Sequence, residues 1–252
     1  MNKIDYVKEC IRHLLLKYKL RILRIGPYSI FDFESFLYRH LAVHKRLTFL
    51  QIGANDGIMN DPIYQFNVAN RDVVSGFVLE PLPDIFEKLV ENYKCCPGIK
   101  PFNFAIHSTQ SEMILHRVKP ERAAEVPVFA RGIASFDVDH WKKTTLVPGA
   151  DFMEQVKVKC VPITDFIKSN AIDKLDLLLL DTEGYDYEIL MSIDFTNIKP
   201  RIVRFEHGVR DNVMSFDQFM QVCNYLNSYG YQIIAESYDV TAYLLDPNDL
   251  VF

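Results

Sequence analysis

The stretch LTFLQIGANDG, residues 47–57, decides the fold. Its first seven residues form a mostly apolar run of strand length, and Gly53 and Gly57 then enclose a turn that carries Asn55 and Asp56. A buried strand that turns sharply on glycines lets backbone N–H groups approach a ligand closely, as they do at the carboxyl ends of strands in open α/β sheets. We therefore predict that this stretch begins an α/β sheet and that a ligand binds at the turn.

The rest of the chain alternates short apolar runs with helical patterns, which is typical of a parallel sheet with crossover helices. Strands are predicted at 47–53, 76–81, 99–106, 175–181 and 201–207, helices at 83–93, 184–193 and 216–228, and a closing antiparallel pair at 231–237 and 241–246. Pro101 fits best at the start of its strand or at an edge of the sheet, because proline cannot donate a ladder hydrogen bond.

Two segments interrupt this alternation. Residues 107–160 are rich in Pro, Lys, Arg and His, return to a clear strand only at 156–163, and have the size of a substrate-side lid. Residues 4–25 place apolar side chains at helical spacing with Lys and Arg between them, which predicts a basic amphipathic helix. This helix either packs on its own domain or docks on a membrane surface or a partner. A second short helix is predicted around 31–43.

We therefore divide the chain into a helical extension, residues 1–46, and one domain, residues 47–252, in which 107–160 is an insertion. The extension holds ten Lys and Arg against four Asp and Glu, whereas the remainder is acidic. A basic front on an acidic body indicates that the extension has its own role.

Composition limits the function classes. The 252 residues are 49% hydrophobic and 24% charged, which is sufficient for a globular core, and the net charge of −5 argues against nucleic-acid binding. Five cysteines without a paired C-x-x-C spacing indicate neither a disulfide framework nor a zinc site and favour a reducing cytosol. No apolar run reaches the roughly 18 residues of a spanning helix. We expect a cytoplasmic protein, with peripheral membrane contact through 4–25 left open.

The cofactor is indicated by two acids. Glu80 ends the second predicted strand, 23 residues beyond Gly57, where a carboxylate accepts hydrogen bonds from ribose hydroxyls. Asp56 would repel a phosphate but suits a cationic amino acid group. The glycine spacing also departs from the G-x-G-x-x-G pattern of pyrophosphate loops. S-adenosylmethionine therefore fits the turn better than NAD or ATP.

A second group of polar residues follows the later strands. Asp181 and Glu183 come after one apolar run, and Glu206 with His207 comes after the next. Because neighbouring strand ends lie side by side, these side chains should converge. Two mechanisms remain open: His207 or Asp181 acts as general base on a substrate hydroxyl, or Asp181 and Glu206, with or without His207, hold Mg²⁺ or a similar hard cation. A purely structural role for Glu206 and His207 is the third alternative.

The segments FLQIGANDG, FVLEP, FNFAI, IASFDVDHW, VPITDFI, LLLLDTEGYDYEIL and RIVRFEH occur in this order and resemble the FkbM family of S-adenosylmethionine-dependent methyltransferases. The resemblance covers about residues 47–246. It implies a class I methyltransferase fold, which is a Rossmann-like, mostly parallel seven-stranded sheet with an antiparallel closing strand. It also implies O-methylation of a hydroxyl on a sugar, a glycan or a secondary metabolite.

The resemblance extends to individual residues. Ala105 and Ile106 fall where such enzymes flank the adenine, and Asp186 stands where many relatives carry Glu, so its role is open. The full cofactor set is Gly53, Asn55, Asp56, Gly57, Glu80, Ala105, Ile106 and Asp181.

The lid supplies the candidates for substrate contact. His140 and Trp141 are expected to contact the acceptor together with Glu183, because an aromatic face can lie against a sugar ring and an imidazole can bind its hydroxyls.

Two rival functions are an NAD-linked enzyme on the same sheet and an inactive cofactor-binding protein that docks through its N-terminal helix. The sequence indicates neither the acceptor nor the oligomeric state.

Overall fold

The computed structural model describes residues 31–144 and 146–246, and the helix predicted over 4–25 lies outside them. From Phe33 onward the chain forms one compact unit. Helix α2 (Phe33–His44) belongs to this unit, since Leu37 is fully buried and the Phe36 ring contacts Tyr243. α2, which the sequence analysis assigned to the extension, thus packs on the unit that carries the sheet.

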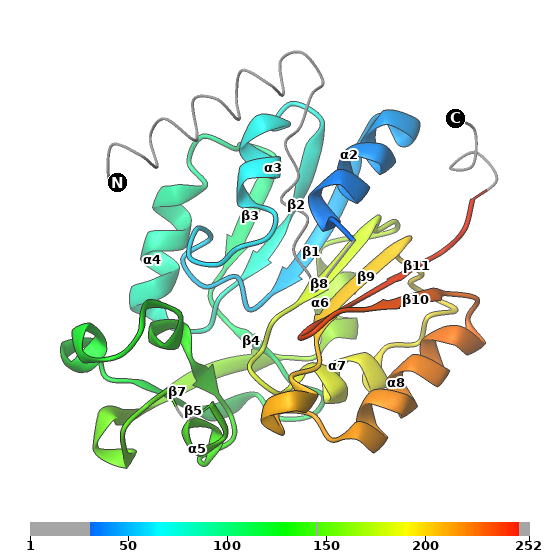
Figure 1. Ribbon diagram of the computed structural model, residues 1–252. Helices are drawn as coiled ribbons and strands as arrows, with labels where there is room; N and C mark the ends of the chain where they lie inside the picture. Colours follow the sequence, from blue (N-terminus) through cyan, green and yellow to red (C-terminus); the bar gives the residue numbers. More distant parts are fainter. Residues whose placement is uncertain (1–30, 145, 247–252) are drawn as a thin grey trace. The chain divides into compact units, whose positions relative to one another are not determined.

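The main sheet has seven strands in the order β10-β11-β9-β8-β1-β2-β3 (Figure 1). These strands are β1 (Leu47–Ile52), β2 (Val74–Leu79), β3 (Ile99–Phe102), β8 (Leu177–Leu180), β9 (Ile202–Glu206), β10 (Gln232–Ala235) and β11 (Asp239–Tyr243). All neighbouring pairs are parallel except the two that involve β11. The predicted mostly parallel sheet with an antiparallel closing strand is confirmed.

The centre of the sheet explains its stability. All four leucines of β8 are buried, because the strand is covered on both faces, as in other parallel sheets. Leu50 and Ile52 of β1 belong to the same core cluster as Leu178 and Leu180, their neighbours on β8. β3 lies at one edge of the sheet, as predicted from Pro101. Proline is tolerated there because an edge strand has no neighbour on one side to accept a hydrogen bond.

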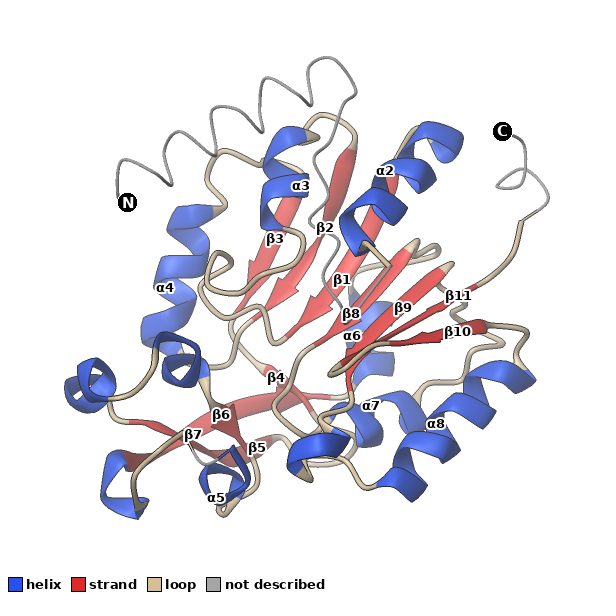
Figure 2. Ribbon diagram, in the orientation of Figure 1, coloured by secondary structure: helices blue, strands red, loops and turns tan. Residues whose placement is uncertain are grey.

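Helices cover both faces of the sheet (Figure 2). The helices α2, α3 and α4 lie on one face, and α6, α7 and α8 lie on the other. Their bounds are α3 (Tyr64–Ala69), α4 (Pro83–Asn92), α6 (Ile163–Ser169), α7 (Asp186–Ser192) and α8 (Phe216–Ser228). The capping box of α8, in which Ser215 and Gln218 bond reciprocally, fixes where that helix starts.

Residues 107–160 contribute most of a second, four-stranded sheet in the order β4-β7-β5-β6. Its strands are β4 (Ala105–Ile106), β5 (Glu112–Val118), β6 (Ala134–Ser135) and β7 (Met153–Val161), with the short helix α5 (His140–Thr144) and three 3-10 turns between them. Figures 1 and 2 show this lid sheet beyond the carboxyl ends of β1, β2 and β3. It therefore stands where a substrate-side lid is expected.

The prediction of one strand over 99–106 is wrong. β3 ends at Phe102, and β4 begins at Ala105 and pairs with β7 of the lid sheet. The side chain of Asn103 donates hydrogen bonds to the carbonyls of Glu80 and Pro81, at 2.9 and 3.1 Å, which holds the chain where it changes sheets.

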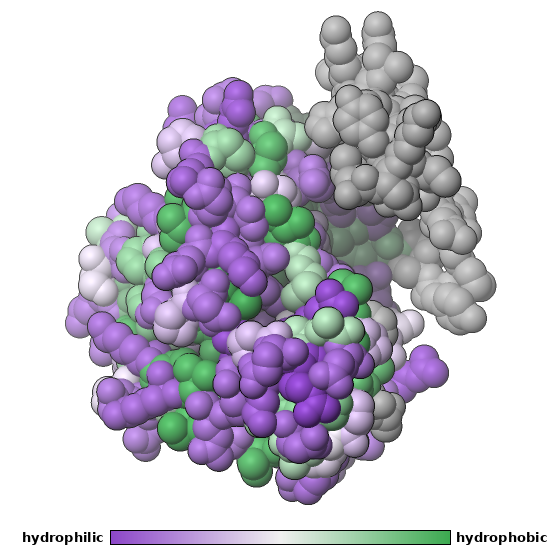
Figure 3. Space-filling model, turned by 90° about the vertical axis from the view of Figure 1, so that its left-hand side faces the viewer, coloured by the Kyte–Doolittle hydropathy of each residue, from purple (hydrophilic) through white to green (hydrophobic). Residues whose placement is uncertain are grey.

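No helix in the part of the chain that the structure describes is long and apolar enough to span a bilayer. Figure 3 views the left-hand side of Figure 1, where hydrophilic residues dominate and hydrophobic residues lie between them in small groups. Scattered apolar residues of this kind are normal on a protein surface.

Candidate active site

A cavity that is open to solvent lies between the carboxyl edge of the main sheet and the lid sheet. The main sheet contributes the ends of β1, β2 and β8, and the lid contributes residues from β5, β6 and the turn before β6. Small-molecule sites in α/β folds lie at this edge of the sheet. The cavity is therefore the candidate active site.

Gly53 joins the cavity to the centre of the sheet. It has a φ of +82°, and a Cβ at this position would lie 1.8 Å from the backbone oxygen of Asp181. Only glycine permits so close an approach of β1 to β8 in this backbone conformation. Gly53, Asn55 and Asp181, three members of the predicted cofactor set, are thus brought to one wall of the cavity.

Asp56 and Gly57 lie outside the residues that line the cavity. Asp56 Oδ1 accepts hydrogen bonds from the backbone N–H groups of Ile58 and Met59, at 2.9 and 2.7 Å. A Cβ on Gly57 would lie 2.8 Å from a methyl carbon of Leu89 in α4 and 2.8 Å from the ring of Tyr93. The structure thus uses Asp56 to brace the turn, which argues against the predicted contact with the cofactor.

The acid that faces the cavity near this turn is Asp61, which the sequence analysis did not select. Its Oδ2 accepts a 2.6 Å hydrogen bond from Gln51 Nε2, and its Oδ1 accepts from the N–H groups of Ile63 and Tyr64. Enclosure by protein raises the pKa of Asp61 to about 6. The Asp61-Pro62 pair before a helix is a helix-start signal that could have located it.

Gln51 beside it is an unusual core residue. It is 2% exposed, lines the cavity, and its Oε1 has no hydrogen-bond partner among the described residues. A buried carbonyl oxygen without a partner costs free energy that a bound donor would recover. Gln51 and Asp61 together offer two acceptors to a cationic amino group.

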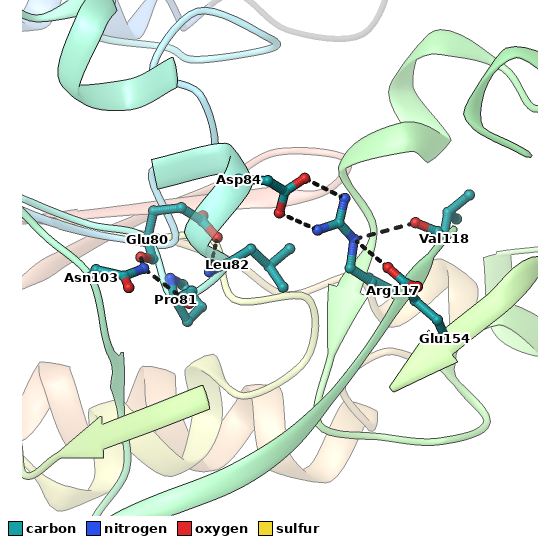
Figure 4. A network of polar contacts seen from close by, with 8 residues as sticks. All are labelled: Glu80, Pro81, Leu82, Asp84, Asn103, Arg117, Val118 and Glu154. Atoms are coloured by element: carbon teal, nitrogen blue, oxygen red, sulfur yellow. Dashed lines mark hydrogen bonds and ion pairs between the residues drawn. The ribbon is translucent and has the colours of Figure 1, made fainter. Parts of the chain in front are cut away.

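Glu80 follows β2 directly and is 6% exposed (Figure 4). Its Oε1 accepts a 2.8 Å hydrogen bond from the backbone N–H of Leu82. Burial raises the pKa of Glu80 to about 7, although N–H groups of Leu82 and Asn55 and the charge of Arg117 act in the opposite direction. The carboxylate therefore lies at the cavity wall with acceptor capacity left for a ligand.

The apolar part of the cavity surrounds Glu80. Ala105 and Ile106, which the resemblance assigns to adenine, line it and are both buried. Leu82, Ile85 and Phe104 line the same region and were not selected from the sequence. A flat aromatic base would be bounded by aliphatic side chains here.

Arg117 of β5 connects the lid sheet to α4 (Figure 4). Its Nη1 and Nη2 bind the two carboxylate oxygens of Asp84, at 2.5 and 3.0 Å, and its Nε lies 3.6 Å from Glu154 Oε1. The Arg117 hydrogen bond lowers the pKa of Asp84. A two-point contact of this kind fixes orientation as well as distance.

Asp181 and Glu206 form an electrostatically coupled pair. Asp181 lines the cavity, whereas Glu206 lies outside the cavity-lining residues. The side chain of Asp181 is exposed at the cavity, but the protein around it, and then repulsion by Glu183, raise its pKa. Burial and the charge of Asp181 raise the pKa of Glu206. A bound cation would favour the ionised form of both carboxyl groups.

Glu183 and His140 are brought together, although they are 43 residues apart, with His140 Nε2 2.9 Å from Glu183 Oε2. Glu183 lines the cavity and has a left-handed φ of +52°, a conformation that costs roughly 1 kcal/mol or more outside glycine. The hydroxyl of Ser135 donates to the Glu183 carbonyl at 2.6 Å. His140 itself is outside the cavity lining and 1% exposed, which argues against direct contact with a substrate.

Trp141 also lies away from the cavity. It packs against the small core of the lid, beside residues such as Val118 and Phe152. The aromatic side chains that do line the cavity are Phe136 and Tyr185, whose rings meet edge to face at 5.1 Å. The sequence prediction thus selected the wrong aromatic residue of the lid for the cavity wall, because nothing in the pattern of 107–160 indicates which rings face inward.

His207 does not have the geometry of a general base. Its Nδ1 accepts from the backbone N–H of Val209 at 3.2 Å, so Nε2 carries the hydrogen and donates to the carbonyl of Glu236 at 3.1 Å. It is 7% exposed and lies outside the cavity lining. Both ring nitrogens are used by the backbone, so the predicted role as base is not supported.

Asp186 serves the loop as well. Its Oδ2 accepts hydrogen bonds from the backbone N–H and the hydroxyl of Thr182, at 3.0 and 2.5 Å. Burial raises its pKa to about 6. No group of three or more His, Cys, Asp or Glu side chains within 31–144 and 146–246 has the arrangement of a metal site.

Comparison with known proteins adds one family. The family model described as the methyltransferase FkbM domain matches residues 51–233. A search of curated proteins found no match.

Solved structures similar to this chain include methyltransferases. The O-methyltransferase from Bacillus cereus in complex with SAH is 9% identical, with 94% of this chain and 90% of that chain covered and a TM-score of 0.44. The fibrillarin pre-rRNA processing protein of Methanococcus jannaschii is 13% identical, with 89% and 82% covered and a TM-score of 0.42.

Proposed function

The chain belongs to the FkbM methyltransferase family, and on this premise we propose that it transfers the methyl group of S-adenosylmethionine to a hydroxyl of a carbohydrate or small metabolite. That it is an S-adenosylmethionine-dependent methyltransferase follows from the family. The hydroxyl acceptor and the residue roles are the proposal. One observation carries them: the same cavity is lined by apolar residues beside Glu80 and by the acids Asp61, Asp181 and Glu183.

The residues fit the methyl donor at three places. Gln51 Oε1 has no partner among the described residues and lies beside Asp61, so the two would accept hydrogen bonds from the amino group of the methionine part. Glu80 would accept from the ribose hydroxyls. Ala105, Ile106 and their apolar neighbours would enclose the adenine.

Asp181 is assigned to the cationic side of the donor. Its backbone oxygen faces Gly53, and its carboxyl group lies in a cluster of acids with a raised pKa. A positive charge nearby stabilises the ionised form of such a group. The acidic wall would therefore bind the positively charged sulfonium donor more tightly than the product, whose sulfur is neutral. This difference would favour both binding of the donor and release of the product.

When bound, S-adenosylmethionine supplies an activated methyl group on a positively charged sulfur. What remains for the protein is to align a hydroxyl oxygen with it and to exclude water, and alignment of this kind contributes much of a rate enhancement. The lid sheet is held over the cavity by Arg117 and by the Glu183–Ser135 hydrogen bond. These contacts position the acceptor side of the site.

A carbohydrate acceptor is supported by the lid face of the cavity. Phe136 and Tyr185 give this side of the cavity an aromatic wall for the C–H groups of a sugar ring, and Glu183 and Arg131 would be polar partners for its hydroxyls.

Calorimetry with S-adenosylmethionine tests the donor half of the proposal. We expect binding by the wild-type chain and binding weakened about tenfold or more in Glu80→Ala, because the ribose loses a charged acceptor. Glu87 is an exposed acid of α4. Glu87→Ala is therefore the matched control and should bind normally. Absence of binding to the wild type would overturn the assignment.

A product screen tests the acceptor half. A cell extract and its glycan fraction are incubated with the enzyme and a methyl-labelled donor, and the labelled species are identified. We expect label in an ether, stable to mild base that cleaves methyl esters. Label only in protein, nucleic acid or ester would refute a hydroxyl acceptor.

A further inference from the structure

The strongest unexplained feature of the cavity is the pair formed by Glu183 and His140. We propose that Glu183 is the proton acceptor for the substrate hydroxyl and that His140 is the residue that positions it. This inference rests on the proposed function and identifies the base that it leaves open. Four observations carry it.

The first observation is placement. Glu183 lines the cavity and its side chain is 27% exposed, so a substrate can reach it. Its backbone carbonyl is held by the Ser135 hydroxyl of β6, which places it at the lid side of the cavity. Asp181 also lines the cavity, and its backbone oxygen faces Gly53 of β1. Of the two acids, Glu183 is the one tied to the lid.

The second observation is the constraint on the backbone. Glu183 and Gly184 both have positive φ values, +52° and +103°. A glutamate in the left-handed region persists only where its surroundings over-determine it, and such positions concentrate at functional sites. Here the conformation points the carboxyl group away from the strand and towards the lid residue His140.

The third observation is how His140 is held. The residue is 1% exposed, so it cannot itself touch a substrate, and its Nε2 lies 2.9 Å from Glu183 Oε2. An ionised carboxylate only accepts, so Nε2 carries the hydrogen and donates it. Oε2 is then engaged and Oε1 remains the oxygen that can take a proton.

The fourth observation is the other ring nitrogen. His140 Nδ1 is buried with no hydrogen-bond partner among the described residues. A second hydrogen on Nδ1 would be a buried donor without an acceptor, which is unfavourable. His140 therefore orients Glu183 through one hydrogen bond and does not carry the proton onward.

The proposed methyl transfer accounts for every bond and every charge. The hydroxyl proton moves to Glu183 Oε1 while the hydroxyl oxygen forms a bond to the methyl carbon and the carbon–sulfur bond breaks. The sulfur keeps that electron pair, which cancels its positive charge, and the products are a methyl ether, S-adenosylhomocysteine and a neutral Glu183. Because Glu183 is partly exposed, it returns the proton to solvent when the products leave.

The other acids near the pair have different partners. Asp186 is bonded to Thr182, and Asp137 pairs with Lys143 at 2.8 Å. Glu206 lies outside the cavity lining, and burial and the charge of Asp181 raise its pKa. Among the described acids at the cavity, Glu183 is the one whose carboxyl group is oriented by a single buried histidine.

Methylation of the glycan fraction by labelled donor, at saturating donor concentration, gives the first test. Glu183→Gln should lower the initial rate about 100-fold, within the usual range for loss of a general base, while calorimetry gives an unchanged affinity for S-adenosylmethionine. Glu112→Gln, an exposed acid of β5, is the control and should be fully active.

The histidine is tested by rescue. His140→Leu should lower the rate about tenfold or more, and His140→Gln should recover most of it, because a glutamine amide can still donate to Glu183 where leucine cannot. His116→Leu, on β5 of the same lid sheet, controls for general loosening of the lid. A merely structural role for His140 would leave the glutamine and leucine variants equally impaired.

A readout independent of turnover is the ¹⁵N-resolved imidazole spectrum. We expect a His140 Nε2–H signal protected from exchange in the wild type and shifted or lost in Glu183→Gln, provided thermal melts show that the variant is folded. An active Glu183→Gln enzyme or an unchanged Nε2–H signal would overturn this inference. Failure of the wild type to bind the donor would instead overturn the proposed function.

Discussion

Arg117 in the lid sheet binds both carboxylate oxygens of Asp84 in the first turn of α4, with N–O distances of 2.5 and 3.0 Å. The Arg117 side chain is 9% exposed, so Asp84 and Glu154 supply the counter-charges for a largely buried guanidinium. Because α4 follows Glu80 directly, the contact ties the lid to the strand end that carries the ribose carboxylate. It also explains why the charge of Arg117 lowers the pKa of Glu80.

Replacing Asp84 by Asn should destabilise the protein by about 1–3 kcal/mol, because a buried guanidinium loses its charged partner. Lysine at position 117 should cost a similar amount, since it cannot make the two-point contact. The free energy of unfolding in urea measures both. The exposed pair of Lys157 and Glu112, which also crosses the lid sheet, is the control, and breaking it should cost less than about 1 kcal/mol. Equal costs for the two pairs would contradict this account.

The affinity for S-adenosylmethionine should rise with pH through about 7. Burial raises the pKa of Glu80 from 4.5 to about 7, so below that value the free protein holds a proton that a ribose contact must displace. Calorimetry between about pH 5.5 and 8.5 should show binding tighten by up to tenfold per unit below pH 7. Glu80→Gln should remove this component and leave a weaker one near pH 6 from Asp61. Identical slopes in the two proteins would disprove the linkage.

The same shift has the opposite sign for the stability of the free protein. The folded-state pKa of Glu80 lies above its ordinary value, so its contribution to stability is complete below about 4.5 and is lost as the pH rises through about 7. The melting temperature without ligand should therefore fall over this window. Glu80→Gln should flatten the fall.

Gly53→Ala should destabilise the fold strongly. The position combines a φ of +82° with a Cβ that would lie 1.8 Å from the Asp181 backbone oxygen, so both strain and overlap contribute. Gly230 is a matched control, because its φ is +91° but a Cβ there would meet nothing within 4 Å. We expect a loss of about 1–2 kcal/mol for Gly230→Ala from backbone strain alone and clearly more for Gly53→Ala. Similar losses in urea unfolding would show that the close approach of β1 and β8 matters little.

Methylation should persist in excess EDTA. The described residues supply no group of three His, Cys, Asp or Glu side chains arranged for a metal, and the proton acceptor proposed above needs none. Initial rates with and without chelator, followed by addition of Mg²⁺, measure this. Loss of activity that Mg²⁺ restores would return Asp181 and Glu206 to the role of metal ligands.

The elements of the sheet could be predicted because their signals are local. Continuous burial marks β8, glycines mark the turn after β1, and Pro101 marks an edge strand. The lid could not be read in the same way. β5 reads EMILHRV and shows no regular alternation, and which face of β5 and β7 is buried depends on a sheet formed between segments 35 or more residues apart.

The site divides along the same line. Gly53, Glu80 and Asp181 follow strands and were found from position alone, and all three line the cavity. Asp56 was chosen for its charge, but two backbone N–H groups of its own turn donate hydrogen bonds to its carboxylate. Glu183 and His140 were selected separately as substrate contacts, but their pairing depends on a contact across 43 residues, so spacing in the sequence carried no signal for it.

His207 shows that a residue at the predicted place in the chain need not have the predicted role. It follows β9 at the edge of the sheet where a base was expected, yet Val209 and Glu236 occupy its two ring nitrogens and Phe219 lies against its ring at 5.1 Å. His207→Ala should therefore lower the free energy of unfolding by about 1–3 kcal/mol, because buried backbone groups lose their partners. Its methylation rate, measured well below the melting temperature, should stay within about threefold of the wild type. A rate loss of the size expected for Glu183→Gln, in a variant that remains folded, would move the base from Glu183 to His207 and would require the loop from Gly208 to Val213 to open during turnover.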